Sequence, residues 1–352
     1  MRVLSIVGAR PQFVKLAPVV AAARREGVDH ATIHTGQHYD PGMSEVFFDE
    51  LGIGPPEWNL AVGSGSHGAQ TGAMLDCLDD LLDRERPDWV LVYGDTNSTI
   101  AGALAAVKLH LRVAHLEAGL RSFNRAMPEE HNRVLTDHAA DLLLAPTEVA
   151  AKHLANEGLA HRTTIVGDVM IDVLLATAAA LDSGAAKGLE TRPAEPFTLA
   201  TIHRAENTDN TTRLAAVINA LAAIETTVLL PLHPRLRDRC AAADIDLNVG
   251  NLRPIDPLSY AEMVDAARTA VAVATDSGGL QKEAFVLGRP VTTLRSETEW
   301  TETLADGWNV LEPDLKNLSS IVLRRSPREA PPAVYGHGHA ADAVINALIA
   351  AN

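Results

Sequence analysis

Short apolar runs in this sequence are repeatedly followed by small or charged residues, the types that can bind ligands or carry out chemistry. Six such endings occur at Gly8 to Lys15, Gly94 to Ser98, Glu117 to Arg121, His203 with Arg204, His233, and Asp276 to Gly279. Open parallel sheets bind ligands just beyond the carboxyl ends of their strands. Because the endings fall in both halves of the chain, we expect one cleft with residues from two domains.

Carboxylates and one histidine among these endings suit proton transfer. Asp95, Glu117 and the pair Glu129–Glu130 form an acidic group in the first half of the chain. Acid–base chemistry at carbon needs a carboxyl group whose pKa is raised by burial or by a neighbouring carboxylate. His203 follows an apolar run in the second half and can donate a hydrogen bond or a proton to a leaving oxygen. Each residue taken singly is more often a helix cap, a surface charge or a structural histidine.

A turn at residues 276–279 has the composition of a phosphate-binding loop. It precedes a helix-like stretch over residues 280–287, and Gly278 and Gly279 leave the backbone N–H groups open to an anion. Taken alone, a capped turn between strand and helix is the commoner explanation, with Ser277 or Asp276 as the cap. Glu283 lies close enough in sequence to accept hydrogen bonds from a ribose diol.

The alternation of apolar runs and helix-like segments predicts the α/β class with parallel sheets. Strands are expected at residues 4–7, 31–34, 89–93, 113–116, 142–145, 197–201, 228–230, 271–274 and 291–294. Residues 177–196 are rich in Ala, Gly, Glu and Pro and indicate a helix end and a linker. We therefore expect two Rossmann-like doubly wound domains, formed by residues 1–170 together with a C-terminal helix at 338–352, and by residues 171–337.

Composition excludes several classes of partner. The 352-residue chain carries a formal net charge of −15, which disfavours nucleic acid but still permits one anionic substrate held by local Arg and Lys. No stretch reaches the roughly 18 apolar residues of a membrane span, and the first ten residues begin a strand–helix unit, so we expect a cytoplasmic protein. His337 and His339 lack further ligands, and the G-x-G-x-x-G match at 63–68 follows a weak strand. We expect neither a metal nor a dinucleotide cofactor.

Five ordered motifs together resemble the non-hydrolysing UDP-N-acetylglucosamine 2-epimerases. They are Gly8-Ala-Arg-Pro-Gln-Phe-Val-Lys15, Tyr93-Gly-Asp-Thr96, His115-Leu-Glu-Ala-Gly-Leu-Arg121, Met127-Pro-Glu-Glu-His-Asn-Arg133, and Thr275-Asp-Ser-Gly-Gly-Leu-Gln281 with Glu283. The resemblance implies two Rossmann-like domains facing across a cleft in a GT-B-like architecture. It also implies a UDP-sugar substrate, no cofactor and a homodimer.

The resemblance also assigns roles to residues. It makes Asp95, Glu117 and Glu129 the acid–base carboxylates and places His203 at the diphosphate. The binding residues it implies are Arg10 at the uridine, Lys15 in the cleft, Arg133 beside the carboxylates, Ser277, Gly278 and Gly279 at the phosphates, and Glu283 at the ribose. Met263 stands where some members stack Phe on uracil, and Trp300 stands where some have Arg, so the contacts to uracil are open.

The implied reaction is reversible epimerisation at C2 of UDP-N-acetylglucosamine. The C2 proton is barely acidic, but its loss becomes feasible when UDP leaves C1 in the same elimination, giving 2-acetamidoglucal. Re-addition of UDP with a proton delivered to the other face gives the manno epimer. This requires a base, an acid and a stabilised leaving group. Which carboxylate removes the proton stays open.

Three alternatives remain. A hydrolysing relative would release N-acetylmannosamine and UDP. A 2-epimerase of UDP-2,3-diacetamido-glucuronic acid is favoured by the segment Arg121-Ser-Phe-Asn-Arg125. A GT-B glycosyltransferase is disfavoured because it needs only one base.

Some bacterial members carry a second, activating UDP-N-acetylglucosamine site. Gln37 and His233 match that site, but Asp40, Ala69 and Ala205 do not. We expect no activation by a second substrate molecule.

Overall fold

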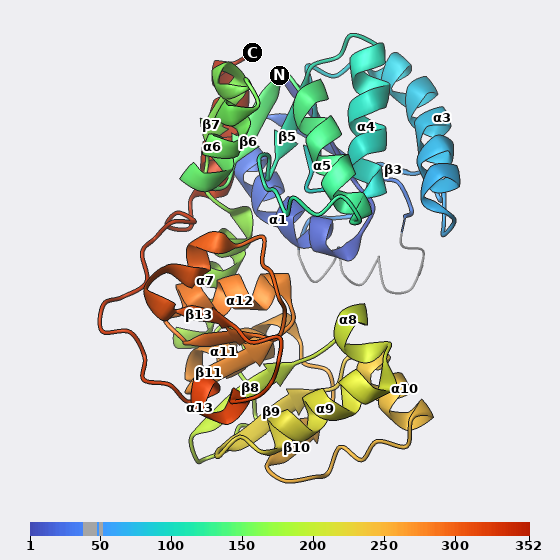
Figure 1. The fold of residues 1–352 in the computed structure, drawn as a ribbon. Helices are drawn as coiled ribbons and strands as arrows, with labels where there is room; N and C mark the ends of the chain where they lie inside the picture. The colour runs from blue at the N-terminus through green and yellow to red at the C-terminus, as the bar shows by residue number, and fades with distance from the viewer. Residues whose placement is uncertain (38–47, 49–51) are drawn as a thin grey trace. The chain divides into compact units, whose positions relative to one another are not determined.

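The computed structural model describes residues 1–37, 48 and 52–352, and Asp40 lies outside this set. The chain forms two compact units (Figure 1). The N-terminal unit comprises Met1–Val173 and Val334–Asn352, and the C-terminal unit comprises Leu174–Ala333. Among the described residues, no helix is both long enough and apolar enough to cross a membrane.

The described part of the N-terminal unit contains a parallel sheet of seven strands in the order β3-β2-β1-β4-β5-β6-β7. The strands are β1 Arg2–Val7, β2 Asp29–His34, β3 Trp58–Asn59, β4 Trp89–Tyr93, β5 Val113–Leu116, β6 Leu142–Ala145 and β7 Thr163–Ile165. Its helices are α1 Arg10–Arg25, α3 His67–Glu85, α4 Asn97–Lys108, α5 Pro128–Ala139, α6 Glu148–Asn156 and α14 Ala340–Ala350, with a 3-10 turn at Ala160–Arg162. Helix α7, Val169–Asp182, begins in this unit and ends in the other.

The C-terminal unit has a parallel six-stranded sheet in the order β10-β9-β8-β11-β12-β13. The strands are β8 Phe197–Thr201, β9 Thr227–Pro231, β10 Leu252–Ile255, β11 Ala272–Thr275, β12 Val291–Thr293 and β13 Asn309–Leu311. The helices are α8 Ala205–Thr208, α9 Thr211–Ala222, α10 Pro234–Ala242, α11 Tyr260–Thr269, α12 Gly278–Val286 and α13 Leu318–Val322, with a 3-10 segment at Thr301–Gly307.

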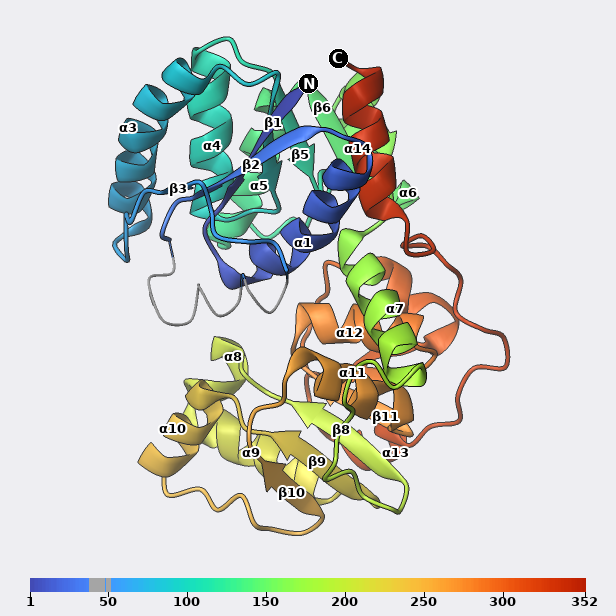
Figure 2. The ribbon, with the colours of Figure 1, turned by 180° about the vertical axis from the view of Figure 1, so that it is seen from behind.

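The C-terminal helix belongs to the N-terminal unit because its apolar face completes that core. Val344, Ile345 and Leu348 of α14 are fully buried in one cluster with residues of α1 and of the sheet, and Figure 2 shows α14 beside α1. The carboxylate of Asp172 accepts hydrogen bonds from the backbone N–H groups of Ala340 (3.0 Å) and Ala341 (2.7 Å). These bonds satisfy donors that the first turn of α14 would otherwise leave without a partner.

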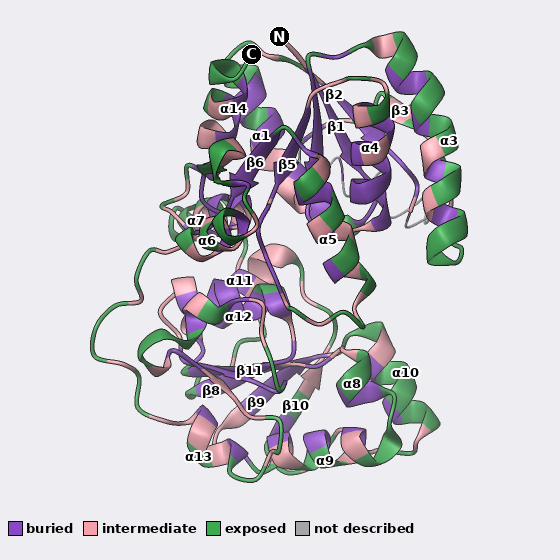
Figure 3. Ribbon diagram, turned by 45° about the horizontal axis from the view of Figure 1, so that its top comes forward, coloured by how far each residue is buried: buried purple, intermediate pink, exposed green. Residues whose placement is uncertain are grey.

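The central strands of both sheets are buried on their two faces (Figure 3). In each sheet the strand order reverses once. The reversal falls between β1 and β4 in the N-terminal unit and between β8 and β11 in the C-terminal unit. The loops that leave the carboxyl ends of these strands separate there and open a crevice suited to a ligand. The segments following these four strands carry Arg10, Asp95, His203 and Asp276.

Candidate active site

In the N-terminal unit, Lys15 and Glu117 form an ion pair at the switch point. Lys15 projects from α1, and Glu117 follows β5 directly. Burial alone would lower the pKa of Lys15, but the attraction of Glu117, with smaller contributions from Asp95 and Asp168, raises it above its ordinary value. Lys15 therefore stays protonated in a crowded acidic site.

Two backbone features allow the Lys15–Glu117 ion pair to lie next to Gly94, in the turn after β4. Glu117 has a φ of +73°, a left-handed conformation that a non-glycine residue adopts at a cost and that clusters at functional sites. Gly94 has a φ of +61°, and a Cβ there would lie 3.2 Å from Glu117 Oε2 and 3.5 Å from Lys15 Nζ. A side chain at this position of the turn that carries Asp95 would therefore be strained and would crowd the ion pair.

Arg133 of α5 joins two further carboxylates. Its guanidinium pairs with Asp95 and, at 3.0 Å, with Glu130 Oε2. Burial alone would lower the pKa of Arg133, but the attraction of Asp95, followed by those of Glu130 and Glu117, raises it. Asp95 and Glu117 thus share one electrostatic environment while each keeps its own cation.

The neighbours Glu129 and Glu130 have different surroundings. Glu130 is buried and accepts hydrogen bonds from Ser122 N (2.9 Å), Ser122 Oγ (2.8 Å) and Phe123 N (2.9 Å). Burial would raise the pKa of Glu130, but these bonds and Arg133 lower it. Glu129 is half-buried in the first turn of α5 and makes no hydrogen bond or ion pair with the residues that the structure describes. Glu130 therefore anchors the 122–123 loop, whereas Glu129 makes no such contact with the described residues.

A buried ionic network lies under the turn at Gly94. His115 contacts Asp137 Oδ1 and the carbonyl oxygen of Gly94, both at 2.7 Å. Asp137 Oδ2 accepts from Arg121 at 2.7 Å, and Arg121 also binds both carboxylate oxygens of Glu157, at 2.8 and 2.7 Å.

In the C-terminal unit, Asp276 organises the switch point. It is fully buried and accepts from the backbone N–H groups of His203 (3.1 Å) and Arg204 (3.0 Å) and from Asn207 Nδ2 (3.1 Å). Its Oδ1 also lies 3.2 Å from His203 Nδ1. Burial would raise the pKa of Asp276, but the bonds to His203, Asn207 and Arg204 lower it. An ionised Asp276 therefore accepts from a protonated His203 Nδ1, and a ring protonated on both nitrogens would also present Nε2–H for donation.

The N-terminus of α12 fits the predicted phosphate-binding turn. Ser277 is the N-cap, and its side chain accepts from Leu280 N. A Cβ on Gly278 would lie 2.5 Å from Glu299 Oε1, so the Glu299 carboxylate occupies the space beside the glycine. Arg295 (3.0 Å) and Arg204 (3.7 Å) pair with the same carboxylate. An anionic group already rests here between a helix N-terminus and two arginines, which shows that the position suits negative charge.

The remaining predicted residues lie at the start of α1, in helices α11 and α12, and just before the 3-10 segment at Thr301–Gly307. Arg10 is exposed at the start of α1. Glu283 is buried in α12 and accepts from Tyr260 Oη at 3.0 Å, and Met263 of α11 is partly buried against the core beside α12. Trp300 is buried under the ammonium of Lys282, which lies 3.9 Å from the centre of the indole ring.

Sequence reasoning named Asp276 only as part of the 276–279 turn and as a possible cap, and it did not select the positioning residues Asp137 and Glu299. Asp276 carried a usable signal, because it follows β11 directly, as Asp95 nearly follows β4. Gln37 accepts from Ser98 N (3.0 Å) and Ser98 Oγ (2.7 Å). His233 caps α10, and its ring centre lies 5.4 Å from that of His203.

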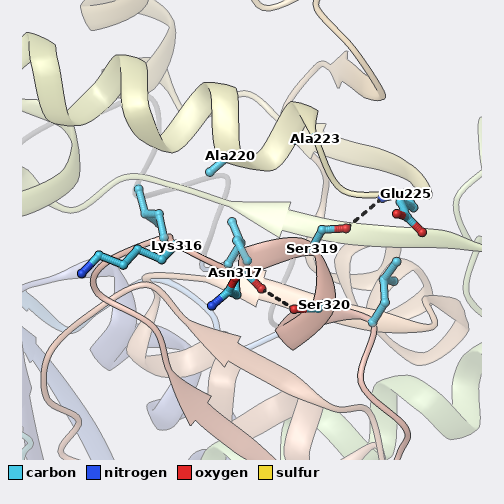
Figure 4. Close-up of a pocket in the computed structure, with 10 residues that line it drawn as sticks. Ala220, Ala223, Glu225, Lys316, Asn317, Ser319 and Ser320 are labelled. Atoms are coloured by element: carbon cyan, nitrogen blue, oxygen red, sulfur yellow. Dashed lines mark hydrogen bonds between the residues drawn. The ribbon is translucent and has the colours of Figure 1, made fainter.

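A surface hollow of about 610 Å³ lies away from these residues, where α9 meets α13 (Figure 4). Its lining consists of Ala220, Ala223, Glu225, Leu315, Lys316, Asn317, Leu318, Ser319, Ser320 and Leu323. The hydroxyl groups there already bond to the protein backbone, Ser319 with Glu225 N and Ser320 with Asn317 O. The hollow contains none of the predicted site residues.

Comparison with known proteins shows the family and the fold. A family model described as UDP-N-acetylglucosamine 2-epimerase matches residues 20–349. A UDP-N-acetylglucosamine 2-epimerase homolog of Methanococcus maripaludis is 49% identical over 331 residues, covering 91% of this chain and 92% of that protein. The UDP-2,3-diacetamido-2,3-dideoxy-D-glucuronate 2-epimerase of Pseudomonas aeruginosa is 48% identical over 318 residues, 88% of each chain.

A solved structure shares the fold. The Methanocaldococcus jannaschii UDP-GlcNAc 2-epimerase, crystallised with UDP-GlcNAc and UDP, matches with a TM-score of 0.85 and 36% identity over 99% of this chain and all of that one. Two doubly wound α/β units, with carboxylates at one switch point and a glycine turn with two arginines at the other, define a protein of the GT-B-like class. The chain belongs to the UDP-N-acetylglucosamine 2-epimerase family. The predicted fold class and family resemblance are confirmed.

Proposed function

We propose that this enzyme interconverts UDP-N-acetylglucosamine and UDP-N-acetylmannosamine without hydrolysis and without a cofactor. The observation that carries the proposal is the arrangement at the N-terminal switch point. Asp95 and Glu117 each pair with a separate cation there, Arg133 and Lys15 respectively, and Glu129 makes no ion pair with the described residues nearby. Several carboxylates in one site supply both a base and an acid, as inversion at carbon requires.

The reaction proceeds in two steps that mirror each other. A carboxylate removes the proton from C2, the C–H electron pair forms the C1–C2 double bond, and UDP leaves C1 with the electrons of the C1–O bond. In the second step the diphosphate oxygen attacks C1, and a carboxylic acid delivers a proton to the opposite face of C2. Lys15 and Arg133 balance the charge of the carboxylates, which would otherwise repel the anionic substrate.

Residues of the C-terminal unit would stabilise the departing UDP. In this proposal the diphosphate takes the anion position at the N-terminus of α12 where Glu299 now lies, and Arg204 and Arg295 pair with the phosphate oxygens. His203, oriented by Asp276, donates a hydrogen bond or proton from Nε2 to the leaving oxygen. Glu283 accepts from the ribose hydroxyl groups, and Arg10 contacts the uridine.

The fate of the glycal separates the proposed reaction from hydrolysis. We expect purified enzyme and UDP-N-acetylglucosamine to give an equilibrium mixture of the two UDP-sugars, followed by anion-exchange chromatography and phosphorus NMR. The same mixture must form from UDP-N-acetylmannosamine. Accumulation of UDP with free N-acetylmannosamine at the rate of substrate loss would instead assign a hydrolysing enzyme.

A second candidate substrate is UDP-2,3-diacetamido-glucuronic acid. The similarity to the Pseudomonas aeruginosa enzyme supports it, and so does Arg125. This arginine is exposed on the loop that Glu130 anchors, and its guanidinium makes no ion pair with the residues that the structure describes. It is therefore available to a carboxylate at C6.

Comparing kcat/KM for the two substrates decides between them. If the uronate is the substrate, Arg125→Ala should lower its kcat/KM by about tenfold or more, the value of one charge-assisted bond, and should leave UDP-N-acetylglucosamine unaffected. Equal loss for both substrates would contradict a contact to the C6 carboxylate.

We also infer that the enzyme is a homodimer, on the family resemblance of its motifs. Light scattering coupled to size-exclusion chromatography tests this, with about twice the chain mass of 37.5 kDa expected. A single species at the chain mass would contradict it.

A further inference from the structure

His115 is a fully buried histidine with a polar atom at each end of its ring. It lies in β5, two residues before Glu117, and none of its side chain is exposed. Nδ1 lies 2.7 Å from Asp137 Oδ1, and Nε2 lies 2.7 Å from the carbonyl oxygen of Gly94. Both distances are those of good hydrogen bonds.

Neither partner of the ring can donate a proton. The Gly94 carbonyl only accepts, and Asp137 is an ionised carboxylate because its other oxygen already accepts from Gly119 N (3.1 Å) and Arg121 (2.7 Å). Burial would raise the pKa of Asp137, but His115 and then Arg121 lower it. A neutral imidazole has one N–H and one lone pair, so it would set a lone pair against an oxygen at 2.7 Å. Only the imidazolium donates at both ends.

The charges around the ring agree with this protonation state. Arg121 pairs with Asp137 and with Glu157, and the side chains of Arg121 and Asp137 are 1% and 0% exposed. With a protonated His115, two cations face two carboxylates in this network and the charge is balanced. With a neutral ring, the fully buried Asp137 would share its one remaining cation, Arg121, with the partly exposed Glu157, which is costly for Asp137.

We propose that His115 is a positioning residue whose ring is protonated on both nitrogens and holds the turn carrying Asp95. Its Nε2–H bond fixes the Gly94 carbonyl from below, while Asn132 Nδ2 donates to the Asp95 carbonyl at 3.0 Å. Hydrogen bonds therefore hold the backbone carbonyl groups of Gly94 and Asp95, and this fixes the turn from which the Asp95 carboxylate pairs with Arg133. The charge state stands on the hydrogen bonds alone, and only the effect on catalysis rests on the proposed function.

Nitrogen NMR tests the charge state without any assay of activity. In enzyme labelled with ¹⁵N-histidine, we expect one ring to keep the imidazolium shifts of both nitrogens from pH 6 to pH 9, and we expect its signals to be missing from His115→Gln or, if that variant does not fold, from His115→Asn. If no ring is doubly protonated at pH 9, or if the persistent ring belongs to another histidine, the proposal is overturned.

Kinetics tests the positioning role. His115→Gln keeps one donor but loses the charge, and we expect kcat to fall about 10- to 100-fold, the value of a charge-assisted hydrogen bond, while KM changes less than about threefold. The matched control is His161→Gln, an exposed histidine of the same unit, which should keep wild-type kcat. Wild-type kcat in a folded His115 variant would overturn the positioning role, whereas inactivity of the wild-type enzyme would count against the proposed function alone.

Discussion

Replacing Asp276 by Asn tests how the C-terminal unit orients His203. The substitution keeps the size of the side chain but turns one accepting oxygen into an NH₂ group. Asp276 Oδ2 accepts from both Arg204 N and Asn207 Nδ2, so the amide oxygen should stay on that side. The NH₂ group then faces His203 Nδ1, which lies 3.2 Å from Oδ1 in the native enzyme. Because two donors cannot pair, the variant disfavours a ring protonated on both nitrogens, the form that pairs with residue 276 and still has an acidic proton on Nε2.

The size of the effect follows from the bonds that change. Hydrogen bonds to a charged group contribute about 1.5–3 kcal/mol each. The variant loses the bond to His203 Nδ1, and its bonds to Arg204 N and Asn207 Nδ2 are then made to a neutral amide instead of a carboxylate. We therefore expect the free energy of unfolding to drop by about 2–4 kcal/mol. Because the wild-type pKa is lowered, this advantage is present above the ordinary value of 3.8 and disappears as the pH falls through the folded pKa. For catalysis, loss of the doubly protonated His203 ring as the acid for the leaving oxygen predicts a kcat reduced about 100-fold or more.

Urea unfolding at pH 7 and pH 3.5, with initial rates at pH 7, measures both effects. Asp265→Asn is the matched control, because Asp265 is also a buried carboxylate of this unit and accepts from Leu189 N at 2.9 Å and from Arg268 at 3.1 Å. It should lose comparable stability and keep its kcat. A folded Asp276→Asn enzyme with kcat within about threefold of wild type would refute the orienting role of Asp276.

Three further predictions use the same logic. Glu129→Gln should lower kcat by about 100-fold with stability unchanged within about 0.5 kcal/mol, whereas Glu130→Gln should cost about 2–4 kcal/mol in urea unfolding because its carboxylate anchors a loop; the reverse pattern would exchange their roles. Gly278→Ala should fold normally, because the flexible Glu299 side chain can shift from the new Cβ, but should raise KM for the UDP-sugar about tenfold; an unchanged KM would place the diphosphate elsewhere. Burial, followed by Arg24, lowers the pKa of His30 from 6.5 to about 4, so stability should fall by about 3 kcal/mol between pH 6.5 and 4 as the unfolded chain takes up the proton, and His30→Gln should remove this slope.

Much of the fold follows from local sequence patterns. The apolar runs 89–93, 113–116 and 142–145 become β4, β5 and β6 with the predicted bounds, because strands buried on both faces have continuous apolar sequences. Helix α1 begins at Arg10, where Gln12 Oε1 accepts from Gly8 N and Ala9 N and stabilises the first turn. Helix α3 was not predicted, and its buried face contains Gln70 as well as Met74 and Leu78.

Some residues of the candidate site could likewise be selected from the sequence, whereas their partners could not. Asp95 and His203 could be selected because they follow strands, which is a local property of the sequence. Their partners could not be selected, because Arg133 is 38 residues from Asp95 and Asp276 is 73 residues from His203. The different environments of Glu129 and Glu130 depend on how a single loop folds back onto α5. Partners that are distant in sequence become neighbours only through the sheet order.

The central claim is that C2 of the sugar loses its proton and regains one from solvent. Incubation of the enzyme with UDP-N-acetylglucosamine in D₂O, followed by proton NMR, measures this directly. We predict that the UDP-N-acetylmannosamine formed carries deuterium at C2. A UDP-N-acetylmannosamine product that retains its original hydrogen at C2 would contradict the elimination and re-addition that the carboxylates are proposed to catalyse.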